Sequence, residues 1–365
     1  MKLITSKLVL LLLLLIPLLT FPSNSNKGKY KKTRTIKKSF HVNDDALLNI
    51  NNRYGNVDIS SWQEDTIEIL VEISVSGNNE DKVLRKFEAI KIEFRSNINK
   101  VSARTLTNKN KSKKWFSWFG WESSNLNYTI NYKIKMPITN QLNISNDYGS
   151  ILINELDGKA NISCDYGKLI IGSLNHSDNK INFDYTNQST IEFMNGGQIN
   201  ADYSGFILEN TNNLVLNADY TSSTIENVKN LNYNCDYGSL TVDKASNIKG
   251  NGDYLTMKFG EILKNVYINA DYSSIKINAV QDGFENVTIV ADYTGIRIGI
   301  DKDTSCNVIA KLSYGNLTFN ENEFTFTKKR LNSTDKYYEG YHKNKNTNAT
   351  ISTTTDFGNV KLFEY

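Results

Sequence analysis

Cysteine, proline and histidine are scarce in this sequence, with three residues of each among 365. Three cysteines cannot all pair, and an exported domain held by disulfides would carry an even number at close spacing. We therefore predict that Cys164, Cys235 and Cys306 are small buried residues. The histidines form no pair with metal-ligand spacing, and no nucleophile-elbow or phosphate-loop motif occurs. Catalysis thus has little support from the residue types present.

The sequence also has almost no excess of charge of either sign, and it has few long apolar runs. The formal net charge is only +3, which gives no indication of nucleic-acid binding. One apolar run, residues 8–19, follows Lys2 and Lys7 and is short for a membrane span, so residues 1–25 are predicted to be a secretory signal peptide. An uncleaved anchor is the alternative, because the run can be extended through Phe21. The mature chain is therefore expected in the periplasm or at the cell surface, and the residues do not distinguish the two.

An Asp-Tyr dipeptide recurs through the middle of the chain. Between Tyr148 and Tyr293 there are 145 residues in eight intervals, a period of about 18 that suits a β-solenoid coil. The nine pairs are Asp147-Tyr148, Asp165-Tyr166, Asp184-Tyr185, Asp202-Tyr203, Asp219-Tyr220, Asp236-Tyr237, Asp253-Tyr254, Asp271-Tyr272 and Asp292-Tyr293. Variants at Tyr54, Tyr314 and Phe357 extend the series to about a dozen rungs.

Apolar residues alternate on both sides of each Asp-Tyr pair, as in strands with one buried face. The predicted fold class is all-β, a β-solenoid (β-helix or β-roll-like) with rungs of about 18 residues and an N-terminal strand-rich excursion. In the unit of Tyr185 the apolar residues after the Tyr come later than in the other units, which predicts a bulge or loop there. A weak helical pattern covers residues 79–89. Open solenoid ends recruit other chains, so residues 60–140 and the C-terminal segment are expected to cap the rod.

The predicted organisation follows from these patterns. Its boundaries are a signal peptide at 1–25, a basic polar linker at 26–46, a first rung plus a β-rich capping excursion at 47–141, solenoid repeats at 142–327, a mobile loop at 328–348 and a last rung at 349–365.

Residues 49–59, which read NINNRYGNVDI, precede a strand region and then the stretch 132–149, YKIKMPITNQLNISNDYG. This order resembles the bacterial putative-adhesin family of β-strand repeats, a head GIN-like domain of unknown function. The resemblance covers nearly the whole mature chain. It implies an exported solenoid and no established chemistry.

The Asp column has two interpretations. Stacked carboxylates one rung apart offer oxygen ligands for Ca²⁺. Charges ~4.8 Å apart repel by roughly 1 kcal/mol even in water, however, so each Asp needs a partner. An Asx-turn, in which the carboxylate accepts a backbone N–H at the corner, is therefore the favoured interpretation, and neither a metal nor another cofactor is predicted.

The parity of the Tyr column places it with the buried residues, which favours core or corner packing over stacking on sugars. A column of asparagines on the outer face is predicted to form an amide ladder. Its members are Asn182, Asn200, Asn217, Asn234, Asn251 and Asn269.

The segment 111–121, KSKKWFSWFGW, holds all but one of the four tryptophans beside a basic run. Such a segment suits a membrane interface, a glycan or a protein partner, and the alternative is a cap over one end of the solenoid. The candidate binding residues are Trp115, Phe116, Trp118, Phe119 and Trp121.

Two function classes stay open at this point. The first is a non-enzymatic exported solenoid, an adhesin or a structural interaction protein of the envelope, whose partner is an envelope protein, a glycan or a membrane surface. The second is a carbohydrate-active β-helix enzyme. Acids that recur in every rung favour the first, because an active site would break the repeat at one place.

Overall fold

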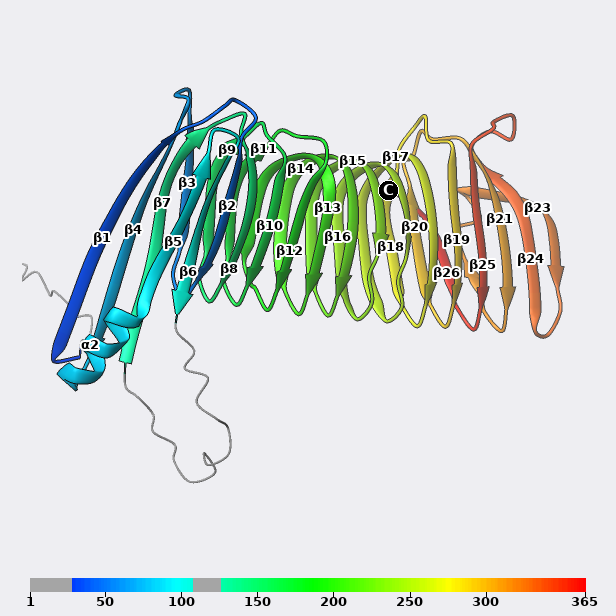
Figure 1. Ribbon diagram of the computed structural model, residues 1–365. Helices are drawn as coiled ribbons and strands as arrows, with labels where there is room; N and C mark the ends of the chain where they lie inside the picture. Colours follow the sequence, from blue (N-terminus) through cyan, green and yellow to red (C-terminus); the bar gives the residue numbers. More distant parts are fainter. Residues whose placement is uncertain (1–27, 108–125) are drawn as a thin grey trace, which may run out of the picture.

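The computed structural model describes residues 28–107 and 126–365, which form a rod built almost entirely of β-strands (Figure 1). All of these strands belong to one sheet that winds around the rod axis. The predicted all-β solenoid class is therefore confirmed. The one helix of the described ranges, α2 (Glu80–Ala89), begins where predicted, and the Asn79 side chain caps it by accepting the backbone N–H of Lys82.

Each rung consists of two strand segments that meet at the Asp-Tyr pair. In the rung around Tyr220, the segment before the pair buries Leu216 and Ala218, and the segment after it buries Ser223 and Ile225. Successive rungs pair in parallel with equivalent residues in register. The Asp-Tyr pairs therefore line up along the rod, in the row of tight turns at the lower edge of Figure 1.

The first solenoid strands are short and alternate between the two sides of the corner. They are β8 (Gln141–Asp147), β9 (Ile151–Leu156), β10 (Ala160–Asp165), β11 (Leu169–Leu174) and β12 (Asn179–Asp184). The next strands run from one corner to the following one without a break. They are β13 (Ser189–Asp202), β14 (Gly205–Asp219), β15 (Ser222–Asn234), β16 (Gly238–Asn251) and β17 (Leu255–Asp271). The predicted irregularity after Tyr185 is a loop, in which Gln188 has a φ of 59°.

The interior is a set of side-chain columns whose sizes compensate from rung to rung. Tyr233 lies in a column with Leu216, Gly250 and Ile268 and is 2% exposed. A Cβ atom on Gly250 would lie 2.3 Å from the Tyr233 ring, so the large residue needs the small one in the next rung. The Tyr233 hydroxyl donates to Met257 Sδ at 3.0 Å.

The strands that precede residue 138 form the N-terminal end of the rod. They are β1 (Tyr30–His41), β2 (Leu47–Arg53), β3 (Val57–Trp62), β4 (Thr66–Gly77), β5 (Ile90–Asn97), β6 (Lys100–Thr107) and β7 (Leu126–Pro137). Rung strands β2 and β3 pair with β8 and β9, and beyond them antiparallel strands end the stack. The prediction of a polar linker at 26–46 is wrong, because β1 pairs with β4 over its whole length.

The C-terminal rung does not end the rod, which corrects the prediction for residues 349–365. The strands after β17 are β18 (Ser274–Val280), β19 (Asn286–Asp292), β20 (Gly295–Ile300), β21 (Cys306–Ser313), β22 (Leu317–Thr318), β23 (Phe324–Leu331), β24 (Asp335–His342), β25 (Thr350–Asp356) and β26 (Val360–Glu364). β25 lies between β19 and β21, and β26 lies between β20 and β22. The final segment is thus inserted between two rungs that precede it in sequence.

A β-hairpin, β23 and β24, closes the C-terminal end by antiparallel pairing with β21. Most of the predicted loop at 328–348 is therefore regular structure, because residues 328–331 belong to β23 and residues 335–342 to β24. The end strands β1 and β23 carry exposed cations, which discourage pairing with a further chain. These cations are Lys31, Lys32, Lys37 and Lys38 on β1, and Lys328, Lys329 and Arg330 on β23. Within the described ranges no helix has the length and apolar character needed to cross a bilayer.

Candidate functional site

The tyrosines of the repeat pack against one another at the outer corner of the rod, so the prediction of corner packing is right and that of burial with the core residues is wrong. Tyr220 is 50% exposed, and its backbone has a φ of 53°. The left-handed conformation turns the side chain outward and shifts the in-out alternation by one residue, so that Thr221 is buried in its place. Extrapolating a period of two through this turn therefore gave the wrong face.

The exposed rings stack into one continuous column. Neighbouring centroids are 4.8–5.2 Å apart and the rings are within 9° of parallel. In spatial order the column contains Tyr54, Tyr148, Tyr166, Tyr185, Tyr203, Tyr220, Tyr237, Tyr254, Tyr272, Tyr293, Phe357 and Tyr314. Each ring inside the column is covered on both faces, so it presents only its edge to solvent and has no face left to stack on a ligand.

The Asp side chains bind backbone from rung to rung. The carboxylate of Asp202, for example, accepts the backbone N–H of Asp219 at 3.2 Å, and Asp219 accepts that of Asp236 at 3.1 Å. The same bond recurs from Asp184 to Asp292, and Asp292 accepts from Asp356. The predicted role as a backbone acceptor is right, but the donor lies in the next rung and not in the same turn.

Charge within the Asp column is only partly compensated. Loss of hydration, followed by the neighbouring Asp184, raises the pKa of Asp165. At the N-terminal end Arg53 takes the Asp position and pairs with Asp147 at 3.0 Å, while its guanidinium lies over the rings of Tyr54 and Tyr148. Among the described residues, no three His, Cys, Asp or Glu side chains come together in a way that could hold a metal ion.

The predicted Asn ladder forms in part. Asn200 donates to Asn182 at 2.6 Å, and Asn217 donates to Asn200 at 2.8 Å. Within the described residues, no such bond links Asn217 to Asn234 or continues to Asn251 and Asn269.

A second amide ladder was missed. Asn230 donates to Asn213 and Asn247 donates to Asn230, both at 2.8 Å, and Asn265 donates to Asn247 at 3.1 Å. The sequence carried a usable signal, since an Asn stands seven residues before the Tyr in these rungs. We name the set Asn213, Asn230, Asn247 and Asn265 the groove ladder.

The groove ladder borders a hollow of about 780 Å³ that runs across successive rungs of β13 to β17 and β19. The outward-facing residues of the same strands line it, one from each rung. They are Gln198, Val215, Asn232, Lys249, Tyr267 and Thr288. We call this hollow the ladder groove.

Tyr267 differs from the tyrosines of the column. It is 46% exposed, and among the described residues no other ring stacks on it and no side chain or backbone group bonds its hydroxyl. Val215, also in the groove, is 42% exposed. The only carboxylate of the described groove lining is Asp178, which is paired with Lys159. The groove therefore offers amides, one exposed aromatic ring outside the column and little charge.

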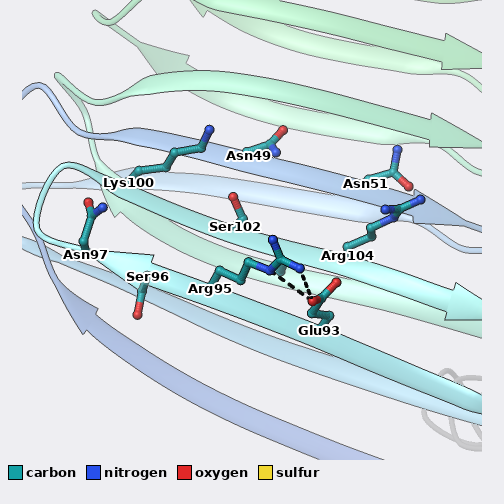
Figure 2. A pocket seen from close by; sticks show the side chains of 10 residues that line it. Asn49, Asn51, Glu93, Arg95, Ser96, Asn97, Lys100, Ser102 and Arg104 are labelled. Atoms are coloured by element: carbon teal, nitrogen blue, oxygen red, sulfur yellow. Dashed lines mark hydrogen bonds and ion pairs between the residues drawn. The ribbon is translucent and has the colours of Figure 1, made fainter.

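A smaller hollow of about 480 Å³ lies at the N-terminal end, between β2, β5 and β6 (Figure 2). Arg95 is held by Glu93 at 2.6 Å, whereas Lys100 and Arg104 extend from β6 beside Asn49 and Asn51 of β2. This hollow is cationic, in contrast to the ladder groove.

The remaining predicted residues fall into two groups. All three cysteines are buried and unpaired, as predicted, and burial raises the pKa of each thiol to about 12. They are therefore inert at neutral pH. The aromatic candidates Trp115, Phe116, Trp118, Phe119 and Trp121, and the predicted signal peptide, lie outside the described residues.

No protein family model matches the chain, and no curated protein matches it. Solved structures do match over most of their length. A putative cell adhesion protein from Clostridium sporogenes shares 10% identity over 92% of this chain and 100% of its own, with a TM-score of 0.18. A putative lipid binding protein from Parabacteroides distasonis shares 14% over 92% and 98%, with a TM-score of 0.30.

A putative adhesin from Parabacteroides merdae shares 16% identity over 92% of this chain and 98% of its own, with a TM-score of 0.28. At these identities and TM-scores the likenesses assign neither family nor activity.

Proposed function

We propose that this protein is a non-enzymatic, exported interaction module of the cell envelope, an adhesin-type rod that binds its partner through the ladder groove. One observation carries the proposal. The groove ladder repeats amide groups once per rung on a rigid surface, and these groups are incompletely bonded within the protein.

The rigidity of the rod supports this role. Parallel backbone pairing, the ring column and the Asp bonds all connect each rung to its neighbours, so the groove residues are held at fixed spacing. A preformed surface loses little conformational entropy when it binds. Repetition also places equivalent contacts along one line, which suits an extended partner.

The enzymatic alternative has weaker support. Glycoside hydrolysis requires two carboxyl groups that face each other across the bond to be cleaved. Among the described residues of the groove lining there is one, Asp178, and its pairing with Lys159 leaves it poorly suited to proton transfer. Binding without turnover is the outcome that this composition favours.

Co-sedimentation with isolated cell envelopes tests the proposal whatever the ligand class. The full chain should sediment with envelopes, and Val215→Lys combined with Asn232→Lys, which fills the groove with charge, should abolish this. Ile207→Lys, on the outer face beyond the Tyr corner, is the matched control and should still sediment. Failure of the unmodified chain to sediment, or release of soluble products from the envelopes, would contradict the proposal.

A further inference from the structure

The groove ladder has spare hydrogen-bonding capacity of a defined kind. An Asn side chain has two N–H donors and two acceptor lone pairs. Asn230 and Asn247 each donate once and accept once within the ladder, so each keeps one donor and one acceptor directed away from it. Asn213 accepts once and keeps both donors. A ligand hydroxyl, which donates and accepts, matches such an amide.

The apolar part of the groove complements this pattern. The Tyr267 ring is exposed and has no other described ring stacked on it, and exposed Val215 lies three rungs before it along strands β14 to β17. A sugar ring presents a face of C–H groups flanked by hydroxyls, so it can pack on an aromatic ring while its hydroxyls reach amides.

Charge and backbone pairing exclude other extended polymers. The described lining holds one cation without an ion-pair partner, Lys249. A single cation is too little charge to bind a polyanion such as nucleic acid. A peptide gains affinity mainly by adding a strand to an open edge, whereas the strands under the groove are paired on both sides. An uncharged polymer with many hydroxyls is the class that remains.

We propose that the ladder groove binds a linear, uncharged polysaccharide lying along the rod axis, with the groove ladder bonding its hydroxyls and Tyr267 stacking on one sugar ring. The inference rests on the proposed function and names its ligand class. Rungs repeat every ~4.8 Å, and one hexose of an extended chain spans a comparable length, so successive sugars can meet successive amides.

The test uses the full chain with linear β-linked glucan, mannan, xylan and N-acetylglucosamine chains, measured by calorimetry. At least one should bind, and its hexamer should bind at least tenfold more tightly than its dimer, because a hexamer spans several rungs. Carboxylated chains and an extended neutral peptide serve as comparison ligands.

Three variants locate the site. Asn230→Ala combined with Asn247→Ala, and separately Tyr267→Ala, should each weaken binding at least tenfold, whereas Tyr267→Phe should retain most of it. Asn217→Ala, in the other amide ladder, is the matched control and should bind normally, and unchanged melting curves would confirm that all variants fold.

Several results would overturn the inference: no binding to any of the four chains, binding that the groove variants leave unchanged, or preference for the carboxylated chain or the peptide. If the chain sediments with envelopes and yet binds none of the four chains or prefers a comparison ligand, the ligand class is wrong and the envelope role stands. Binding that the groove variants leave unchanged would show that the ladder groove is not the site. Failure to sediment would instead remove the proposed function itself.

Discussion

The Asp-Tyr corner and the groove ladder recur at the same interval, but the protein uses their bonding capacity to different extents. At the corner both faces of the inner rings are covered, and the Asp carboxylates from Asp184 onward accept a backbone N–H from the next rung. In the groove ladder each inner amide keeps a donor and an acceptor, and Tyr267 has no other described ring stacked on it. The most frequent repeat is therefore structural, and the candidate site lies where the repeat leaves groups unbonded.

The backbone at the corner also adopts an unfavourable conformation, which the strands of the groove do not. A non-glycine residue in the left-handed region costs roughly 1–2 kcal/mol, and each column aromatic adopts it. Stacking of parallel rings contributes ~0.5–1.5 kcal/mol per pair beyond burial, which offsets this cost when a ring has two neighbours. Glycine would relieve the strain but would break the column, which explains why an aromatic occupies the turn.

Alkaline pH should produce the largest difference between the two regions. Loss of hydration, followed by neighbouring tyrosines, raises the pKa of Tyr166, Tyr237 and Tyr272. The folded rod thus favours the neutral phenol, so the stabilisation is complete below the unfolded value of about 10 and is lost as pH rises through the raised pKa. Urea unfolding between about pH 9 and pH 12 should show a steep fall in stability.

A variant with phenylalanine at these three positions should keep its stability to higher pH, because the rings still stack and cannot ionise. An identical fall in the variant and the unmodified chain would show that the column does not control the alkaline response.

Tyr220→Ala measures the column at neutral pH. The substitution removes two stacked contacts, with Tyr203 and Tyr237, and should lower the free energy of unfolding by about 1–3 kcal/mol. Tyr220→Phe is the matched control and should change it by less than about 0.5 kcal/mol, since Phe357 fills the equivalent place in its own rung. Denaturant unfolding gives both values, and an equal loss in the two variants would mean that the hydroxyl and not the stack stabilises the corner.

Asp219→Ala should have a smaller effect. It removes the bond to the backbone N–H of Asp236, and such bonds to charged groups contribute ~1.5–3 kcal/mol. The change also relieves repulsion from the Asp of the adjacent rungs, roughly 1 kcal/mol per unit-charge pair at this spacing in water, so the net loss should be about 1 kcal/mol. Asp219→Asn keeps the acceptor without the charge and should match or exceed the unmodified stability, and a larger loss in Asn than in Ala would contradict the inter-rung bond.

The sequence predicted the rung but not every consequence of winding it. Strict alternation on both sides of the Asp-Tyr pair gave the solenoid, its parallel register and the buried cysteines, because each is a local property of a strand with one buried face. The predicted inward position of Tyr220 was wrong, because a single left-handed residue shifts the alternation of buried and exposed side chains.

Non-local features were harder to predict. Insertion of β25 between β19 and β21 leaves no mark on the sequence, because Asp356-Phe357 reads like any other corner. The groove ladder could have been predicted from the sequence, since its Asn recurs seven residues before the Tyr. The exposed position of Tyr267 in the groove could not have been predicted in this way, because it depends on which residues the neighbouring rungs place beside it.

Ca²⁺ should change the stability less than any of the substitutions above. This result would support the contrast between the corner, whose groups are bonded, and the groove, whose groups are not. If the Asp column is saturated by backbone donors, millimolar Ca²⁺ should leave the melting temperature nearly unchanged, because an ion that binds the folded state would raise it. Ca²⁺ takes six to eight oxygen ligands, and the carboxylates from Asp184 to Asp292 each already commit one oxygen to the next rung. Calorimetric melts with Ca²⁺ and with Mg²⁺ at equal ionic strength check this, and the Mg²⁺ sample controls for screening of the column charges. A rise of several degrees specific to Ca²⁺ would show that the corner retains free ligands, and the division between a saturated corner and an open groove would fail.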